Sequence, residues 1–130
     1  MVSPLDYFKV RSDRRNGVVR VVLEGELDLA TVPILEEHLS SLEPDGVAAE
    51  LIDLRDLTFI DSAGLRALFA ASNRARDNGH RFAVVGASEP ARGLFRLSGA
   101  DRLLHETEGM RLLESFTNFP TPPSRDGDRG

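Results

Sequence analysis

The sequence predicts an α/β fold, with a mostly parallel sheet of four to five strands, an N-terminal antiparallel hairpin and helices mainly on one face. Two observations support this prediction. Alternating apolar residues between positions 8 and 23 are interrupted by Asn16-Gly17, and beyond residue 31 helical and extended apolar patterns follow each other in turn. Repeated β-then-α units require parallel strands joined by right-handed crossovers. Crossovers between neighbouring strands place their helices on the same face of the sheet.

The first predicted element is the hairpin. Asn-Gly is the dipeptide that best accepts a positive φ at both central positions of a type I′ turn. Asn16-Gly17 therefore marks the turn, and the residues on both sides of it alternate between apolar and mostly polar positions. The residues expected to share one buried face are Phe8, Val10, Val19, Val21 and Leu23.

The first helix is predicted to begin near Thr31, a favourable N-cap residue, with Pro33 in its first turn. Pro44-Asp45-Gly46 is predicted to end it, and residues 47–54 form the next strand. Helical spacing places four apolar residues on the buried face: Val32, Leu35, Leu39 and Leu42.

The second helix is predicted to start at Asp61 or Ser62 and to stop at Asn78-Gly79, which favours a left-handed C-terminal residue. Residues 82–85 then form a third parallel strand. The third helix has Ser88 as its N-cap and ends at Gly99. Leu103 and Leu104 are predicted to begin a short last strand, and residues 110–116 form a last helix. The buried side of the second helix is predicted to carry Leu65, Leu68, Phe69 and Ala75.

Composition and length fit one soluble globular domain. The chain has 130 residues, of which 41% are apolar. We predict a domain over residues 5–116 and a flexible tail over residues 117–130. The tail contains three prolines and too little apolar surface to offset the entropy of ordering it.

Several function classes are disfavoured by composition. The formal net charge is −5, whereas a nucleic-acid binder normally needs a basic face. Arginines group locally at residues 74, 76 and 81, which we interpret as part of a solvated surface of mixed charge.

The absence of cysteine excludes disulfides and cysteine-ligated zinc. The longest apolar run, residues 67–71, is too short to cross a bilayer. The N-terminus also lacks the pattern of a secretion signal. We therefore expect a cytoplasmic monomer without membrane contact, metal or cofactor.

Two segments are predicted to lie at the carboxyl ends of strands, where α/β folds gather ligands and partners. One is Gly25-Glu26-Leu27-Asp28, and the other is residues 58–65, which lead into the second helix. Ser62 would then lie at a helix start, where unpaired N–H groups and the helix dipole favour anions. A phosphate there would add about −1.5 to −2 charges and three acceptor oxygens. The alternative is that Ser62 only caps the helix, an ordinary role for serine.

The motif Asp61-Ser62-Ala63-Gly64-Leu65, preceded by Leu57-Thr58-Phe59-Ile60, resembles the signature of the STAS-domain anti-sigma factor antagonists. Gly25-Glu26-Leu27-Asp28 upstream and residues 90–99 downstream are similar to further segments of that family. The resemblance covers residues 8–116. Many members have a hydroxyl residue at the position of Ala63. The alanine in this chain removes that second possible phosphoacceptor and leaves Ser62 intact.

The resemblance implies a partner switch. In this family the unphosphorylated antagonist binds an anti-sigma factor that is itself a serine kinase, and a sigma factor is freed. The kinase uses ATP and magnesium to phosphorylate the serine that matches Ser62. The phosphorylated form then releases its partner, and a serine phosphatase resets it. The residues expected to take part in partner binding are Asp28, Thr58, Asp61, Ser62, Gly64 and Leu65.

The sequence leaves other interpretations open. Asp28 and Asp61 are equally suited to cap the first and second helices. The same fold also serves as an accessory STAS subunit of transport or stress-sensing complexes.

Two unrelated classes are also considered. A phospho-aspartate receiver would use Asp53, but it also needs a late lysine, and Lys9 is the only lysine. A serine hydrolase needs a histidine base beside Ser62. His38 and His80 are predicted to lie far from Ser62, whereas His105 is not excluded by its position, and the Gly-x-Ser-x-Gly motif is absent.

Overall fold

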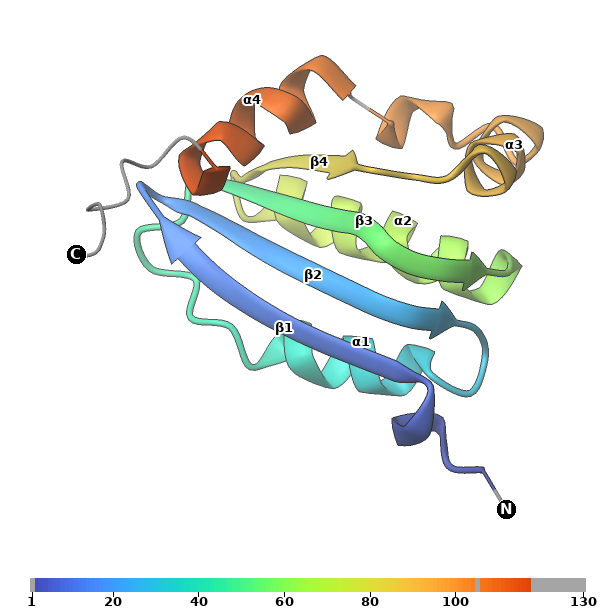
Figure 1. The fold of residues 1–130 in the computed structure, drawn as a ribbon. Helices are drawn as coiled ribbons and strands as arrows, with labels where there is room; N and C mark the ends of the chain where they lie inside the picture. Colours follow the sequence, from blue (N-terminus) through green and yellow to red (C-terminus); the bar gives the residue numbers. More distant parts are fainter. Residues whose placement is uncertain (1, 105, 118–130) are drawn as a thin grey trace.

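The computed structural model describes residues 2–104 and 106–117 and is built around one four-stranded sheet (Figure 1). Strands β1 (Phe8–Arg15) and β2 (Val18–Leu27) are antiparallel. Strands β3 (Ala49–Ile60) and β4 (Arg81–Val85) continue the sheet parallel to β2. The order β1-β2-β3-β4 follows the chain, so the predicted crossovers between neighbouring strands are confirmed.

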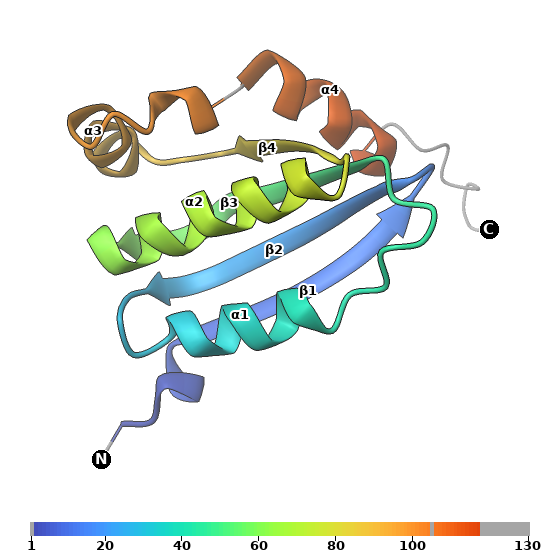
Figure 2. The same ribbon diagram turned by 180° about the vertical axis from the view of Figure 1, so that it is seen from behind.

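Both faces of the sheet carry helices. The crossover helices α1 (Val32–Ser40) and α2 (Ser62–Asp77) cover one face, as Figure 2 shows, and the core on that face also takes in α3 (Glu89–Leu97). Helix α4 (Glu106–Thr117) packs against β4 on the opposite face. The predicted bias of the helices to one face is confirmed. The exception is α4, which follows the last strand and is therefore not a crossover.

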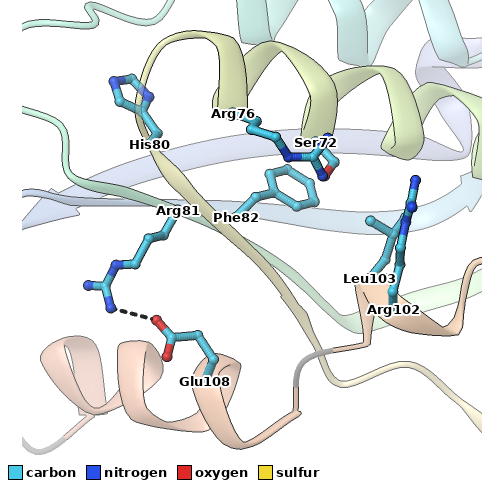
Figure 3. Close-up of a pocket in the computed structure, with 8 residues that line it drawn as sticks. All are labelled: Ser72, Arg76, His80, Arg81, Phe82, Arg102, Leu103 and Glu108. Atoms are coloured by element: carbon cyan, nitrogen blue, oxygen red, sulfur yellow. Dashed lines mark hydrogen bonds and ion pairs between the residues drawn. The ribbon is translucent and has the colours of Figure 1, made fainter.

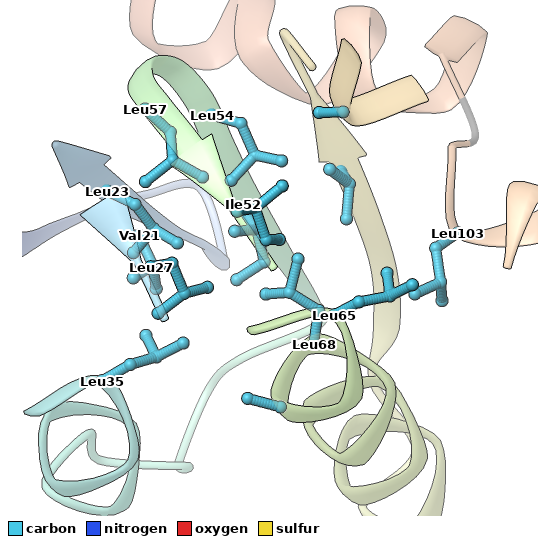
Figure 4. Close-up of a cluster of buried hydrophobic side chains, with 14 of the residues drawn as sticks. Val21, Leu23, Leu27, Leu35, Ile52, Leu54, Leu57, Leu65, Leu68 and Leu103 are labelled. Carbon is cyan, nitrogen blue, oxygen red and sulfur yellow. The ribbon is translucent and has the colours of Figure 1, made fainter. Parts of the chain in front are cut away.

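The main core lies between the sheet and the crossover helices (Figure 4). Leu35 of α1 and Leu68 of α2 are fully buried against apolar side chains of the two central strands. Truncating such a leucine to alanine typically costs about 2–5 kcal/mol, because a cavity adds to the lost transfer free energy. The strand residues in this layer include Val21, Leu23, Leu27, Ile52 and Leu54.

The hairpin turn forms as predicted. Asn16 has φ 52° and Gly17 has φ 79°, the two positive values that a type I′ turn requires. The turn fixes the register, which pairs Arg15 with Val18 and Phe8 with Gly25. The same register places Tyr7 beside the far end of β2.

One predicted strand is wrong. Leu103 and Leu104 do not begin a strand, because residues Asp101–Leu103 form a short 3₁₀ helix, η2. Leu103 is buried in the main core from this turn. Its apolar character therefore reflects burial beneath α3 and not pairing with a neighbouring strand.

Three predicted boundaries are shifted. Helix α1 ends at Ser40, before the predicted stop, and Leu42 packs on the core from the loop that follows. Strand β3 runs on to Ile60, beyond the predicted end at residue 54, because it keeps pairing with the long strand β2. Helix α4 starts at Glu106 instead of Met110. By contrast, the predicted limits of α2 are confirmed, with Asn78 at its C-cap.

The ends of the chain add little to the sheet. A 3₁₀ helix, η1 (Pro4–Asp6), precedes β1. The predicted tail lies outside the described residues apart from Thr117, which ends α4. Within the described part of the chain, no helix combines the length and apolar character needed to cross a membrane.

The first turn of α2 lies directly against the end of β2 at Gly64. A Cβ on Gly64 would approach the Leu27 carbonyl oxygen to 2.7 Å and Ile60 Cγ1 to 2.9 Å. The backbone N–H of Asp61 donates to the same Leu27 oxygen at 3.2 Å. The missing side chain thus lets α2 begin immediately over the ends of β2 and β3.

We predict opposite effects of alanine at two helical glycines. Gly64→Ala should lower the free energy of unfolding by about 1–3 kcal/mol, because the new methyl group meets backbone and packed side chains. The matched control is Gly93→Ala in α3, where a Cβ would meet nothing within 4 Å. This variant should raise the free energy of unfolding by about 0.5–1 kcal/mol through helix propensity. Urea denaturation measures both changes, and equal effects would contradict the described packing of Gly64.

Candidate functional site

The two segments that the sequence singled out lie side by side at one end of the sheet. In the parallel register, Glu26 pairs with Phe59 and Leu27 with Ile60. The Thr58 hydroxyl donates to the Gly25 carbonyl oxygen at 3.0 Å, which ties the segments together across the two strands. The ends of β2 and β3 therefore form one continuous surface that leads into α2.

Ser62 is the first residue of α2, and its side chain is exposed. The N-cap is Asp61, whose Oδ1 accepts the N–H of Gly64 at 2.9 Å. Asp61 therefore does the capping work, so the interpretation of Ser62 as the cap is wrong. Among the described residues, no hydrogen bond engages the Ser62 hydroxyl. An accessible hydroxyl thus stands at the positive end of a 16-residue helix.

Asp28 organises the loop between β2 and α1. Its Oδ1 accepts the backbone N–H groups of Ala30 and Thr31, both at 3.0 Å. Its own N–H donates to the Thr31 hydroxyl at 2.8 Å. These contacts form a closed turn, so the side chain of Asp28 stabilises the loop from within and remains half-buried.

Thr31 occupies the predicted N-cap position of α1, but its side chain does not make the expected cap bond. It precedes α1 and adopts a helical conformation. Its hydroxyl instead donates to the Glu26 carbonyl oxygen at 2.9 Å, and the residue is 0% exposed. The sequence carries no signal for which partner the hydroxyl of an N-cap threonine bonds, because the Glu26 carbonyl is brought to it by the fold.

Tyr7 joins the same loop from the N-terminal side. Its phenol lies close enough to the Asp28 carboxylate to feel its charge. Partial desolvation, followed by the negative charge of Asp28, raises the pKa of the Tyr7 phenol. Sequence reasoning missed this contact, although the Asn16-Gly17 turn predicts a register that brings Tyr7 next to the Gly25 segment. The backbones of the two segments are in close contact, since a Cβ on Gly25 would lie 2.0 Å from the Tyr7 carbonyl oxygen.

Two apolar side chains project from the site into solvent. Leu29, in the loop after β2, is 73% exposed, and Phe59, near the end of β3, is 50% exposed. A hollow of about 120 Å³ lies beside Phe59 and reaches Ser88 and Pro90 at the start of α3. An exposed aromatic side chain beside a hollow is a feature that many protein-binding surfaces share.

The predicted partner-binding residues fall into two layers. Thr58 and Ser62 are exposed, and Asp28 and Asp61 are half-buried, so all four can be reached from outside. Gly64 and Leu65 are buried. The backbone that approaches Gly64 is the chain's own, at the Leu27 carbonyl oxygen. Gly64 and Leu65 support the surface from beneath.

The two unrelated chemistries do not fit the geometry. Asp53 is 2% exposed in the middle of β3, where Arg55 donates to both its carboxylate oxygens. A phospho-aspartate acceptor would instead need an open carboxylate at a strand end. His38 bonds Ser12 at 3.0 Å and His80 bonds Glu50 at 2.7 Å, so neither touches Ser62. His105 lies outside the described residues. Among those that are described, no cluster of His, Asp and Glu suits a metal ion.

Comparisons with known proteins agree on one family. The family model described as "Mlab, STAS domain" matches residues 10–106. The anti-sigma-B factor antagonist of Staphylococcus aureus is 33% identical over 103 residues, which is 79% of this chain and 95% of that protein. The protein of the same name from Staphylococcus epidermidis is 33% identical over 92 residues, covering 71% of this chain and 85% of that protein.

Solved structures show the same architecture. An anti-sigma factor antagonist from Mycobacterium paratuberculosis superposes with a TM-score of 0.70 at 26% identity, over 85% of this chain and 97% of that chain. The antagonist SpoIIAA in its unphosphorylated form gives a TM-score of 0.64 at 18% identity, over 85% and 96% of the two chains. On its fold, its matching family model and these relatives, the chain belongs to the STAS-domain anti-sigma factor antagonist family.

Proposed function

We propose that this chain is an anti-sigma factor antagonist whose unphosphorylated form binds an anti-sigma factor serine kinase and so frees a sigma factor. The observation that carries the proposal is the exposed, unengaged hydroxyl of Ser62 at the start of α2, at the same end of the sheet as the exposed residues Leu29 and Phe59. The names of the relatives support the role. We place the protein in the cytoplasm, where such partners act, and assign it no direct contact with nucleic acid or membrane.

The proposed modification is phosphorylation of Ser62. The serine Oγ attacks the γ-phosphorus of ATP held with magnesium by the partner kinase, the new O–P bond replaces the bond to ADP, and ADP leaves. A serine phosphatase reverses the step by hydrolysis. SpoIIAA, a structural neighbour, has been solved in both an unphosphorylated and a phosphorylated form.

The position of Ser62 explains why a phosphate would leave the free protein folded. The first N–H groups of a helix lack acceptors within the helix, and the dipole favours negative charge there. The Asp61 cap already satisfies the N–H of Gly64 and is independent of the Ser62 hydroxyl. The modification therefore alters the charge of the surface without removing an existing contact.

The same phosphate would oppose binding. Asp28 and Asp61 already place carboxylates on this surface, and a dianion adds about two further negative charges beside them. Enclosing that group in a fitted interface removes its hydration without supplying a matching donor. Each 1.4 kcal/mol of penalty weakens binding about tenfold, so two or three kcal/mol make an effective switch.

We assign the affinity of the docked state mainly to Leu29 and Phe59. Apolar anchors near the centre of an interface commonly carry most of the binding energy, while polar neighbours contribute orientation. Thr58, Asp28 and Asp61 would form the polar part of the contact. Gly64 and Leu65 would contribute by fixing the position of α2.

The phosphorylation site provides the first test. With the purified cognate kinase, ATP and magnesium, we expect one phosphate per chain, and mass spectrometry should place it on Ser62. Ser62→Ala should accept none, whereas Thr58→Ala, the control at the neighbouring exposed hydroxyl, should still be phosphorylated. Phosphate found on any other residue of the wild-type protein would refute the assignment.

Binding to the kinase provides the second test. By calorimetry, Ser62→Ala should retain wild-type affinity, and both Ser62→Asp and the phosphorylated protein should bind at least about tenfold more weakly. Ser98→Asp is the matched control, because it adds the same charge at an exposed serine that ends α3. If Ser62→Asp and Ser62→Ala bind equally well, the proposed switch is wrong.

The apolar anchors provide the third test. Leu29→Ser and Phe59→Ser should each weaken kinase binding by about tenfold or more. The free energy of unfolding should change by less than about 0.5 kcal/mol for Leu29→Ser and should fall by about 1–2 kcal/mol for Phe59→Ser, because Phe59 is half-buried. Met110→Ser on α4 serves as the control, because Met110 is similarly exposed but lies on the helix that covers the opposite face. A binding loss in the Met110 variant as large as in the others would move the interface elsewhere.

The alternative function, an accessory STAS subunit of a transport or stress-sensing complex, predicts a different partner. Purification of the tagged wild-type chain from its own cells should recover a small kinase-fold protein if the antagonist role is right. Recovery of a membrane transport protein without any kinase would favour the alternative.

A further inference from the structure

We propose that a cleft between α2, the start of β4, η2 and the start of α4 binds the phosphate group of a small aromatic phosphate monoester (Figure 3). The cleft has a volume of about 390 Å³. This site is separate from the partner surface and does not depend on the proposed function. The residues that carry the argument are Ser72, Arg76, Arg81, Phe82, Arg102 and Glu108.

The cleft is positively charged in an otherwise acidic protein. Three guanidinium groups line it, and Glu108 is the one carboxylate among its described lining residues, whereas the whole chain carries −5. Arg81 pairs with Glu108 at 2.8 Å. Arg76 and Arg102 have no carboxylate partner among the described residues. This pair therefore supplies the excess positive charge that would attract an anion.

Local contacts hold both of these arginines while leaving donors free. Arg76 donates one hydrogen bond to Asn73 Oδ1 at 3.2 Å. The guanidinium of Arg102 lies over the ring of Phe69, 5.3 Å from its centre. A guanidinium has five N–H donors, so each group keeps several for a phosphate oxygen, with which arginine forms strong paired hydrogen bonds.

Ser72 gives an independent indication of a ligand. Its side chain lines the cleft, yet the residue is only 4% exposed. Among the described residues, its hydroxyl has no hydrogen-bond partner. Buried hydroxyl groups are nearly always hydrogen-bonded, so an unpaired one at the wall of a basic cleft suggests that a bound molecule completes it. The Ser72 hydroxyl would donate its hydrogen bond to a phosphate oxygen.

The apolar wall of the cleft indicates what carries the phosphate. Phe82 and Leu103 line the space beside the arginines. Ligand sites for small molecules typically measure about 300–1,000 Å³ and combine apolar walls with a few polar groups. Inorganic phosphate alone would leave most of this volume empty. An aromatic ring bonded to the phosphate would pack on Phe82.

Titration of the full chain with phenyl phosphate and with inorganic phosphate, followed by NMR at about 0.15 M salt, tests the proposal. Phenyl phosphate should bind saturably and several times more tightly than inorganic phosphate. Arg76→Gln and Arg102→Gln should each weaken phenyl phosphate binding at least about tenfold. Ser72→Ala should weaken it by a smaller factor. The control is Arg74→Gln, which removes the same charge from the same last turn of α2 but outside the cleft.

The outcomes distinguish specific binding in the cleft from non-specific attraction of an anion to surface arginines. Unchanged binding by Arg74→Gln, together with the two losses, would support the site. Absence of saturation in the wild-type chain, or an equal loss in Arg74→Gln, would overturn it. Equal affinity for the two anions would overturn the aromatic monoester as the ligand. Since Arg76 and Arg102 are exposed, thermal unfolding of the three arginine variants should match that of the wild-type chain.

Discussion

The close contact between the first turn of α2 and the end of β2 is the constraint on which the candidate site depends. A glycine at position 64 lets the helix backbone reach the Leu27 carbonyl, and the N–H of Asp61 bonds the same oxygen. Because β2 and β3 are paired to their ends, this contact also fixes the loop that Asp28 closes. The exposed Ser62 hydroxyl is thereby held in a fixed position by the packing of α2 on the sheet. Recognition of one partner requires such a fixed position.

The division of roles around Ser62 gives the proposed switch its physical basis. Asp61 caps the helix and Asp28 closes the neighbouring loop, so neither the helix nor the loop uses the Ser62 hydroxyl. A phosphate added there acts on the charge and hydration of the surface. Its effect would fall on association, where a desolvated dianion is costly, and not on the stability of the free domain, where the helix terminus tolerates it. The basic cleft lies about 15 Å further along α2, so an anion bound there would not occupy the docking surface.

Much of the fold can be predicted from local sequence patterns, namely turn residues, helix caps and apolar spacing. Asn16-Gly17 predicts the hairpin and its register, and the helical spacing between Asp61 and Asn78 predicts α2 to its limits. Predictions of secondary structure and of side-chain roles fail where a residue is buried for a reason other than the one its local pattern suggests. Leu103 is apolar because it fills the core from a turn, not because it pairs in a strand. Thr31 is the N-cap residue of α1, but its hydroxyl bonds the Glu26 carbonyl oxygen and not the first N–H groups of the helix. These distinctions depend on contacts between segments, which periodicity alone does not contain.

The central claim is that phosphorylation of Ser62 changes the surface and leaves the fold intact. The most direct measurement is amide hydrogen exchange on the free protein before and after stoichiometric phosphorylation. Protection over α2 and β3 should stay the same within error while the affinity for the kinase falls. Loss of protection in the first turns of α2 on phosphorylation would contradict it, because release would then arise from local unfolding instead of charge.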